Sequence, residues 1–143
     1  MSNIDGGSGS LHINLPNGGQ HQMILDGGSG SYKLTADAPS ELKLAVDAGS
    51  GSGYIKLSED ATADIALDGA SGSTKIEVEG NPGVRFILEH RGSGSVHLPS
   101  ELIQTAGGHK NKTGAWESAN FDSAERKVVI RADLGSGSFK LAN

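Results

Sequence analysis

The chain has 143 residues, among them 22 glycines, a formal net charge of −5 and no cysteine. This length is enough for one domain with its own core, and the acidic balance argues against nucleic acid as a partner. The lack of cysteine excludes disulfides, thiol catalysis and zinc–thiolate sites, and the sequence contains no run of about 18 apolar residues that would predict insertion into a membrane.

A Gly-Ser-Gly-Ser segment recurs along the chain at a fixed spacing. It begins at residues 7, 28, 49, 92 and 135, and an Ala-Ser-Gly-Ser copy begins at residue 70. The successive spacings are 21, 21, 21, 22 and 43 residues, the last being two periods and one residue. A constant period in this range is typical of solenoids and other repeat arrays.

Apolar residues recur at even offsets from the first glycine of each repeat. Offset 6 is always Ile or Leu, at Ile13, Leu34, Ile55, Ile76, Leu98 and Leu141. The period of two predicts two short strands per repeat, at offsets 2 to 8 and 14 to 18, with alternate side chains on a common core. We therefore predict an all-β fold, a single-domain parallel β-solenoid over residues 1–143 with six to seven coils of about 21 residues.

The regular coils are expected over residues 5–102, followed by an irregular excursion over residues 103–126 and a final coil over residues 127–143. The excursion is polar and rich in glycine, and its Trp116 and Phe121 are expected to cap or plug the core where the ladder is irregular. After the excursion, apolar residues again fall at even offsets when positions are counted back from the last Gly-Ser-Gly-Ser segment. The glycine column at offset 2 is expected to point inward and to permit a bend or a close approach of the facing sheet.

The repeat unit Leu-Asp-x-Gly-Ser-Gly-Ser-x-x-Leu, at residues 25–34, resembles the toast-rack type of bacterial β-solenoid domain. The ending is similar too, with Trp-Glu-Ser-Ala-Asn-Phe at 116–121, Ala124, Val-Val-Ile at 128–130 and Leu-Gly-Ser-Gly-Ser at 134–138. Related domains occur in surface adhesins and in Lia-type cell-envelope stress proteins. The resemblance therefore implies a structural role and favours an extracellular or cell-surface location. A cytoplasmic location is the alternative, because the sequence begins without a signal peptide.

No cluster in the sequence supports catalysis. Five histidines, no cysteine and no Ser-His-Asp set with sensible spacing leave nucleophilic and metal chemistry without support, so we predict no enzyme activity, no cofactor and no metal site. An acidic column precedes the repeats, at Asp5, Asp26, Asp47, Asp68 and Asp133, with His90 in the remaining place. Calcium binding is one interpretation of this column, and solvated turn carboxylates are the other; the aspartates precede the glycines, which favours turns.

Three outward columns are candidates for binding. A mildly basic stripe could bind an anionic polymer, or its charges could prevent unwanted contacts between sheets. The stripe consists of His12, Lys33, Tyr54, Lys75, His97 and Lys140. An apolar strip suggests a lateral partner or a covering loop, and consists of Ile24, Ala45, Ala66 and Ile87. The serine columns beside the glycines fit ice or polymer binding, or close packing against another protomer.

The two ends of the chain have complementary strand patterns. Residues 1–4 fit the end of a second strand, whereas the chain closes on a first strand that lacks its second. We therefore predict a head-to-tail filament of identical protomers, a heterologous contact that need not close. The expected self-assembly interface consists of Ile4, Leu11, Ile13, Leu15, Phe139 and Leu141. The alternatives are an interaction or sensing module of the bacterial cell envelope, with an envelope protein as partner, and ice or polymer binding.

Overall fold

The computed structural model describes residues 2–5, 9–15, 20–36, 41–58, 62–69, 71–80, 83–91, 94–99, 102–107, 114–124 and 127–142. Within these ranges, the side chains of residues 2–5, 15, 48, 69, 90, 91, 106 and 107 are not described. All regular secondary structure in the described ranges is β-strand.

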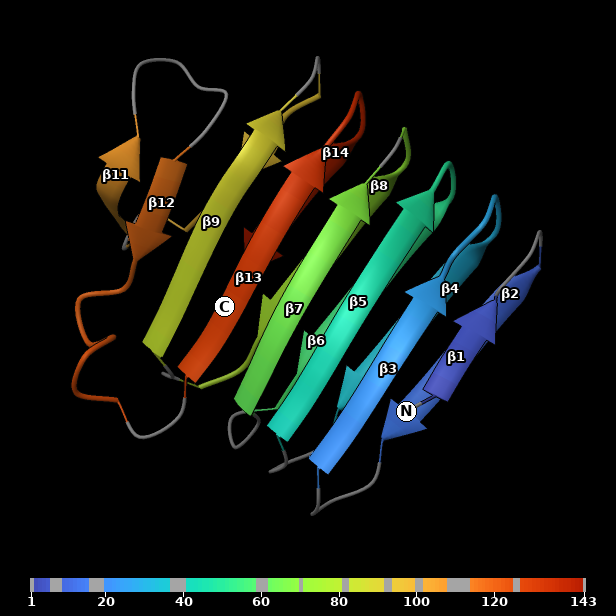
Figure 1. The fold of residues 1–143 in the computed structure, drawn as a ribbon, viewed down its shortest axis with the longest axis horizontal. Helices are drawn as coiled ribbons and strands as arrows, with labels where there is room; N and C mark the ends of the chain where they lie inside the picture. The colour runs from blue at the N-terminus through green and yellow to red at the C-terminus, as the bar shows by residue number, and fades with distance from the viewer. Residues whose placement is uncertain are drawn as a thin grey trace.

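The described strands form two sheets, one in front of the other in Figure 1. Sheet A has, in spatial order, β1 (Ser2–Asp5), β3 (Gln20–Asp26), β5 (Glu41–Gly49), β7 (Thr62–Gly69), β13 (Lys127–Leu134), β9 (Gly83–Arg91), β12 (Gly114–Glu117) and β11 (Ile103–Gly107). Sheet B has β10 (Val96–His97), β14 (Ser138–Ala142), β8 (Ser73–Val78), β6 (Ser52–Leu57), β4 (Ser31–Ala36) and β2 (Ser10–Leu15). Each of the first four repeats contributes one strand to each sheet.

Neighbouring repeats pair in parallel, and over the first four repeats the paired residues are mostly 21 apart. Leu34 pairs with Ile13 on one side and with Ile55 on the other. Alternate residues of each strand are buried, because a strand directs successive side chains to opposite faces; in β4 the pattern runs from exposed Ser31 to buried Tyr32 and exposed Lys33. The prediction of an all-β fold built from parallel strands is confirmed.

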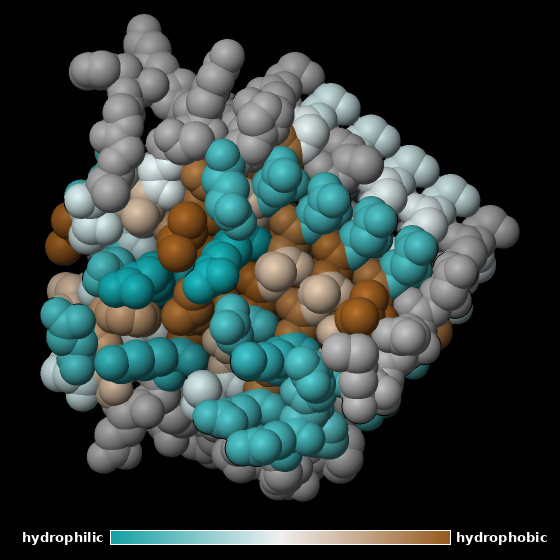
Figure 2. Space-filling view, in the orientation of Figure 1, coloured by the Kyte–Doolittle hydropathy of each residue, from teal (hydrophilic) through white to brown (hydrophobic). Residues whose placement is uncertain are grey.

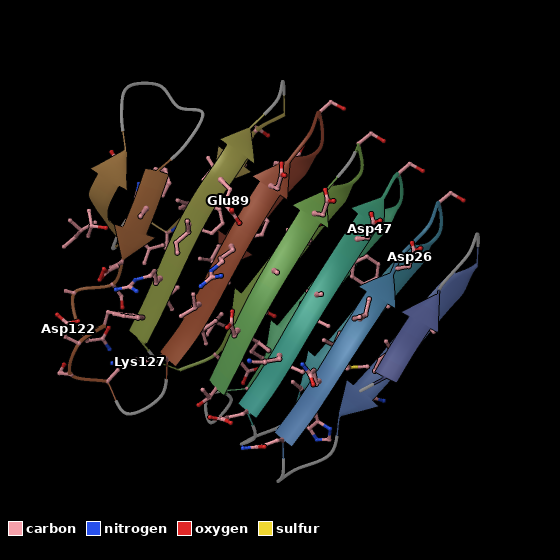
Figure 3. The ribbon with its side chains drawn as sticks, in the orientation of Figure 1. Asp26, Asp47, Glu89, Asp122 and Lys127 are labelled. Atoms are coloured by element: carbon pink, nitrogen blue, oxygen red, sulfur yellow. The ribbon has the colours of Figure 1, made fainter. Side chains whose placement is uncertain are left out.

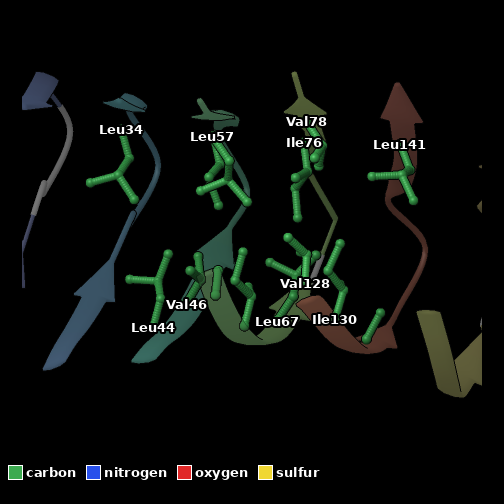
Figure 4. Packing of buried hydrophobic residues seen from close by; sticks show 14 of the residues in the cluster. Leu34, Leu44, Val46, Leu57, Leu67, Ile76, Val78, Val128, Ile130 and Leu141 are labelled. Carbon is green, nitrogen blue, oxygen red and sulfur yellow. The ribbon is translucent and has the colours of Figure 1, made fainter. Parts of the chain in front are cut away.

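The core lies between the two sheets and is almost entirely aliphatic. Figure 4 shows two facing rows of side chains, with Leu34, Leu57 and Ile76 on one sheet and Leu44 and Leu67 on the other. Each such side chain is at most 3% exposed. Burying an aliphatic side chain of this size contributes ~1.5–3 kcal/mol, so the stacked columns supply most of the favourable free energy of folding.

The glycine column is explained by contact between neighbouring repeats. A Cβ atom at Gly51 would lie 1.6 Å from the carbonyl oxygen of Gly30, and one at Gly72 would lie 1.8 Å from that of Gly51. A larger residue would therefore push the backbones of stacked repeats apart. The sequence-based interpretation was a bend of the chain or a close approach of the facing sheet, whereas in the structure the close approach is that of the neighbouring repeat.

The C-terminal strand pair is inserted into the stack and does not end it. β13 pairs with β7 on one side and β9 on the other, and β14 lies between β8 and β10. In Figure 1 the red C-terminal strands lie between green and yellow strands. The expectation that the final coil over residues 127–143 forms one end is therefore wrong for its described residues.

The excursion over residues 103–126 was expected to be irregular, but it contains a two-stranded antiparallel hairpin. β12 pairs antiparallel with β9, and β11 pairs with β12. The edge of β9 has backbone groups that need hydrogen-bond partners, and β12 supplies them. Trp116 packs on the core, with its ring centroid 5.9 Å from that of Phe86. Phe121 is buried elsewhere, with its ring 4.4 Å from the guanidinium carbon of Arg85.

Candidate binding surfaces

The first repeat presents an edge of each sheet. β1 and β2 are the outermost strands at this end of the stack, as far as the described residues show. Leu11 and Ile13 point to the core but remain half-buried, whereas Leu34, one repeat further along, is fully buried. Of the other predicted interface residues, Ile4 is placed only by its backbone pairing with Leu25, and the side chains of Ile4 and Leu15 lie outside the description.

Phe139 and Leu141 do not belong to an open end, and their assignment to a self-assembly interface is corrected. They are 0% and 4% exposed, and strands flank them on both sides. The Phe139 ring stacks on Phe86 of the facing sheet, with a centroid distance of 5.1 Å. The core of the protein itself therefore uses the apolar surface that was expected to bind a second copy.

The apolar strip on the outer face of sheet A is shorter than predicted. Ile24, Ala45 and Ala66 lie in register on β3, β5 and β7, and all three are exposed. The inserted β13 then places Arg131 between Ala66 and Ile87, which breaks the strip. The covering-loop interpretation is not seen in the described residues, because β11 and β12 extend the sheet at its edge.

A shallow depression of about 330 Å³ lies over this strip. Its lining combines apolar and charged residues, namely Ile24, Ala45, Val46, Asp47, Ala66, Leu67, Asp68, Glu89, Arg131 and Asp133. Figure 2 shows the face, where tan and brown atoms lie beside a row of teal side chains. The depression exists because the alanine side chains are small. The carboxylates of the lining form an acidic border.

The acidic border is an in-register row of aspartates at the ends of the sheet A strands, formed by Asp26, Asp47, Asp68 and Asp133. The carboxylate of Asp26 accepts a hydrogen bond from the N–H of Gly28 at 3.1 Å, and that of Asp47 accepts one from Gly49 at 3.3 Å. These are turn contacts, as the sequence favoured. Figure 3 shows Asp26 and Asp47 at corresponding positions on neighbouring strands.

The outer face of sheet B has the opposite charge. The column at offset 5 forms a row across all six strands, in the order His12, Lys33, Tyr54, Lys75, Lys140 and His97, which we call the cationic row. The sequence predicted its members but not their order. The insertion of β14 places Lys140 between Lys75 and His97 and closes a gap in the row.

Tyr54 joins the lysines of this row. The Nζ atoms of Lys33 and Lys75 each lie 5.6 Å from the centroid of its ring, a distance at which cations are attracted to an aromatic face. Its hydroxyl donates a hydrogen bond to the Glu77 carboxylate. This bond raises the pKa of the Tyr54 phenol and lowers the pKa of Glu77, because it is strongest when Glu77 is charged and Tyr54 is protonated.

A row of serine hydroxyls runs beside the cationic row on the same face, formed by Ser10, Ser31, Ser52, Ser73, Ser138 and Ser95, all of them exposed. Two shallow hollows follow this row. One, of about 460 Å³, is lined by Ser10, Ser31 and Ser52 among others. The second, of about 270 Å³, is lined by Ser73, Ser95 and Ser138 together with two lysines and a histidine of the cationic row.

Among the described residues, no group of three or more histidine, aspartate or glutamate side chains is arranged to hold a metal ion. In the same part of the chain, no helix has the length and apolar character needed to cross a membrane. The surfaces that the structure offers are flat, repetitive and shallow, a geometry suited to binding extended partners.

Comparison with known proteins gives a structural match. No family model matches the chain, and no curated protein matches it. The fold is similar to that of a solved structure from Clostridium sporogenes described as a putative cell adhesion protein, with a TM-score of 0.63 and 11% sequence identity over 99% of this chain and 91% of the other. At this identity the match establishes a shared all-β fold.

Proposed function

We propose that the chain is a non-catalytic structural module of the bacterial cell surface, a β-solenoid of the toast-rack type, that associates with copies of itself through its first repeat. The fold shared with the clostridial protein, whose description mentions cell adhesion, supports the location and the structural role. The observation that carries the self-association is the unprotected edge of β2.

Within residues 10–15, the sequence of strand β2 has none of the features that protect a sheet edge. Its sequence, Ser-Leu-His-Ile-Asn-Leu, contains no proline and no lysine or other formally charged residue. The opposite end of the stack is protected: β10 has only two residues, and β11 has a bulge between Gln104 and Ala106. One open end per chain favours a two-fold contact that closes as a dimer over a head-to-tail filament.

A two-fold axis across the edge brings two β2 strands together in antiparallel orientation. In the register that places Leu11 opposite Ile13 of the second copy, both half-buried side chains complete their burial on the core side. The dimer would bury the apolar surface that the first repeat leaves accessible.

Sedimentation equilibrium tests this proposal. The wild-type chain should reach twice the monomer mass as its concentration rises, and Ile13→Lys should remain monomeric, because pairing would bury the introduced charge. Thr35→Lys, which adds the same charge to the outer face of an interior strand, should still form the dimer. A wild-type chain that stays monomeric contradicts the proposal, and a mass that grows without limit supports the head-to-tail filament instead.

A second candidate function is capture of an envelope protein at the depression on sheet A. Ile24 is 42% exposed there, beside two alanines and the acidic border. The chemistry fits an apolar side chain flanked by basic residues. A labelled peptide of alternating leucine and lysine should bind the wild-type chain and the Asp64→Asn control, and should bind Ala66→Trp more weakly, because the indole fills the depression. Equal anisotropy titrations for all three proteins would rule this candidate out.

A further inference from the structure

We propose that the outer face of sheet B binds a linear anionic polysaccharide along the cationic row. This inference is independent of the self-association at the β2 edge. It rests on the charge of the row, its continuity across the sheet and the hydroxyl groups beside it.

The cationic row is continuous because the last strand is inserted. Lys75 pairs in register with Lys140, and Lys140 pairs with His97. None of the three lysines of the row forms an ion pair with a described carboxylate, and of the three only Lys75 contributes to lowering the pKa of Glu77. Tyr54 lies between Lys33 and Lys75 and places an aromatic face beside their cationic groups.

The nearest described carboxylates on this face are already engaged. Glu77 accepts the hydrogen bond of the Tyr54 hydroxyl, and Glu79 pairs with Lys56 at 3.0 Å. Both carboxylates lie on the side of the cationic row away from the serine row. The strip that combines lysines and serines is therefore free of acidic groups among the described residues.

The spacing of the row suits a sugar polymer. Neighbouring strands are ~4.8 Å apart, so the six positions span ~24 Å, and each step is close to the length of one pyranose residue. Each strand offers a hydroxyl and most offer a cation or a histidine. Sugar hydroxyls can pair with the serines while carboxylates of the polymer pair with the lysines, and a sugar ring can pack on Tyr54.

Nucleic acid fits the surface less well. The chain carries a net charge of −5, and the row contains no arginine, the residue best suited to forked contacts with phosphate. A second copy of the chain is the other candidate, because the acidic row on sheet A has the same pitch and the opposite charge. The experiment distinguishes these occupants.

The probe is polygalacturonate, which bears a carboxylate on every sugar, titrated calorimetrically at low ionic strength into the full chain. The wild-type protein should bind it, and binding should weaken as salt is added, because the contacts are exposed. The variant Lys33→Gln/Lys75→Gln/Lys140→Gln should bind at least about tenfold more weakly, since three exposed ion pairs are lost together.

A matched variant keeps the test specific. Lys43→Gln/Lys127→Gln/Arg131→Gln removes the same charge from sheet A and should bind polygalacturonate as the wild type does. Neutral dextran should not bind. Thermal unfolding curves should show that both variants are folded, because all six side chains are at least partly exposed.

Three results would overturn the proposal. Equal losses in the two triple variants would indicate general electrostatics, and equal affinity for single-stranded DNA would remove the preference for a polysaccharide. If polygalacturonate does not bind but the sheet B variant abolishes self-association, the face is a contact between copies of the chain.

Discussion

Tyr54 contacts residues of the repeats on both sides of its own. Its hydroxyl is held by Glu77, which is 23 residues away in the sequence, and its ring lies near two lysines on the adjacent strands. These contacts exist only because the strands are stacked in register. The side chain is therefore a sensitive reporter of that register.

A pH-dependent effect follows from the Tyr54–Glu77 hydrogen bond. It lowers the pKa of Glu77, so its stabilising contribution is present above the ordinary carboxyl pKa and is lost as the pH falls through the lowered value. It raises the pKa of Tyr54 above 10.0, so the contribution is also lost as the pH rises through that raised value. Tyr54→Phe should return the Glu77 pKa toward its ordinary value in an NMR titration of the side-chain carboxyl carbon.

Tyr32→Phe is the matched control, because Tyr32 is a buried tyrosine on the opposite face of the same sheet. It should leave the titration of Glu77 unchanged. A Glu77 titration that does not respond to Tyr54→Phe would show that the hydrogen bond does not form in solution.

At the scale of the strand, β14 and β2 have the same alternation of polar and apolar residues but occupy different positions in sheet B. β14 has neighbours on both sides, and β2 has a described neighbour on one side. Leu141 is consequently 4% exposed, whereas Ile13 at the same offset is only half-buried. The position in the sheet, and not the residue type, determines how much each side chain stabilises the fold.

Truncating these two residues should reveal the difference. Leu141→Ala should lower the free energy of unfolding by ~2–5 kcal/mol, as expected for a cavity in a packed core, and Ile13→Ala should lower it less. Lys140→Ala, which points outward from β14, should change it by no more than ~0.5 kcal/mol. Urea unfolding at a concentration low enough to keep the chain monomeric gives all three values. Equal losses for Leu141→Ala and Ile13→Ala would mean that β14 is an edge strand.

The sequence could predict the strands of the regular coils and the register of most of their pairs, but not the β11–β12 hairpin or the spatial order of the strands. The alternation of Leu, Ile and Val at even offsets defines which side chains are buried, and the period defines which residues pair. The sequence does not show the order of the strands, because all of them have the same apolar pattern: Ile130 pairs with Ile65 on one side and with Phe86 on the other. Only the contacts in the folded molecule show that β13 separates β7 from β9.

At the scale of the whole molecule, the two outer faces differ in charge, with aspartates along sheet A and lysines along sheet B. The sequence predicted the membership of both rows. It could not predict the interruption of the apolar strip by Arg131 or the closure of the cationic row by Lys140, since both follow from the inserted strands. Binding surfaces in this fold are therefore determined by strand order as well as by the repeat.

The two proposals do not depend on each other, but the proposed dimer would affect the proposed ligand binding. In the antiparallel register that places Leu11 opposite Ile13, the two copies of His12 lie opposite each other across the contact. The cationic row of one protomer then continues into that of its partner. A dimer would present a cationic row of twice the length to a long polymer, and its affinity would increase through multivalency.

The insertion of β13 and β14 also has a consequence for how the chain is made. The place between β7 and β9 can be filled only after residues 127–134 have been synthesised, because β13 follows both of these strands in the sequence. β13 and β14 follow in the sequence the strands that they separate, and they join the two parts of the stack by pairing on both sides. The same place would accept residues 127–142 of another molecule, so we expect exchange of this segment between chains to be the characteristic misassembly of this fold.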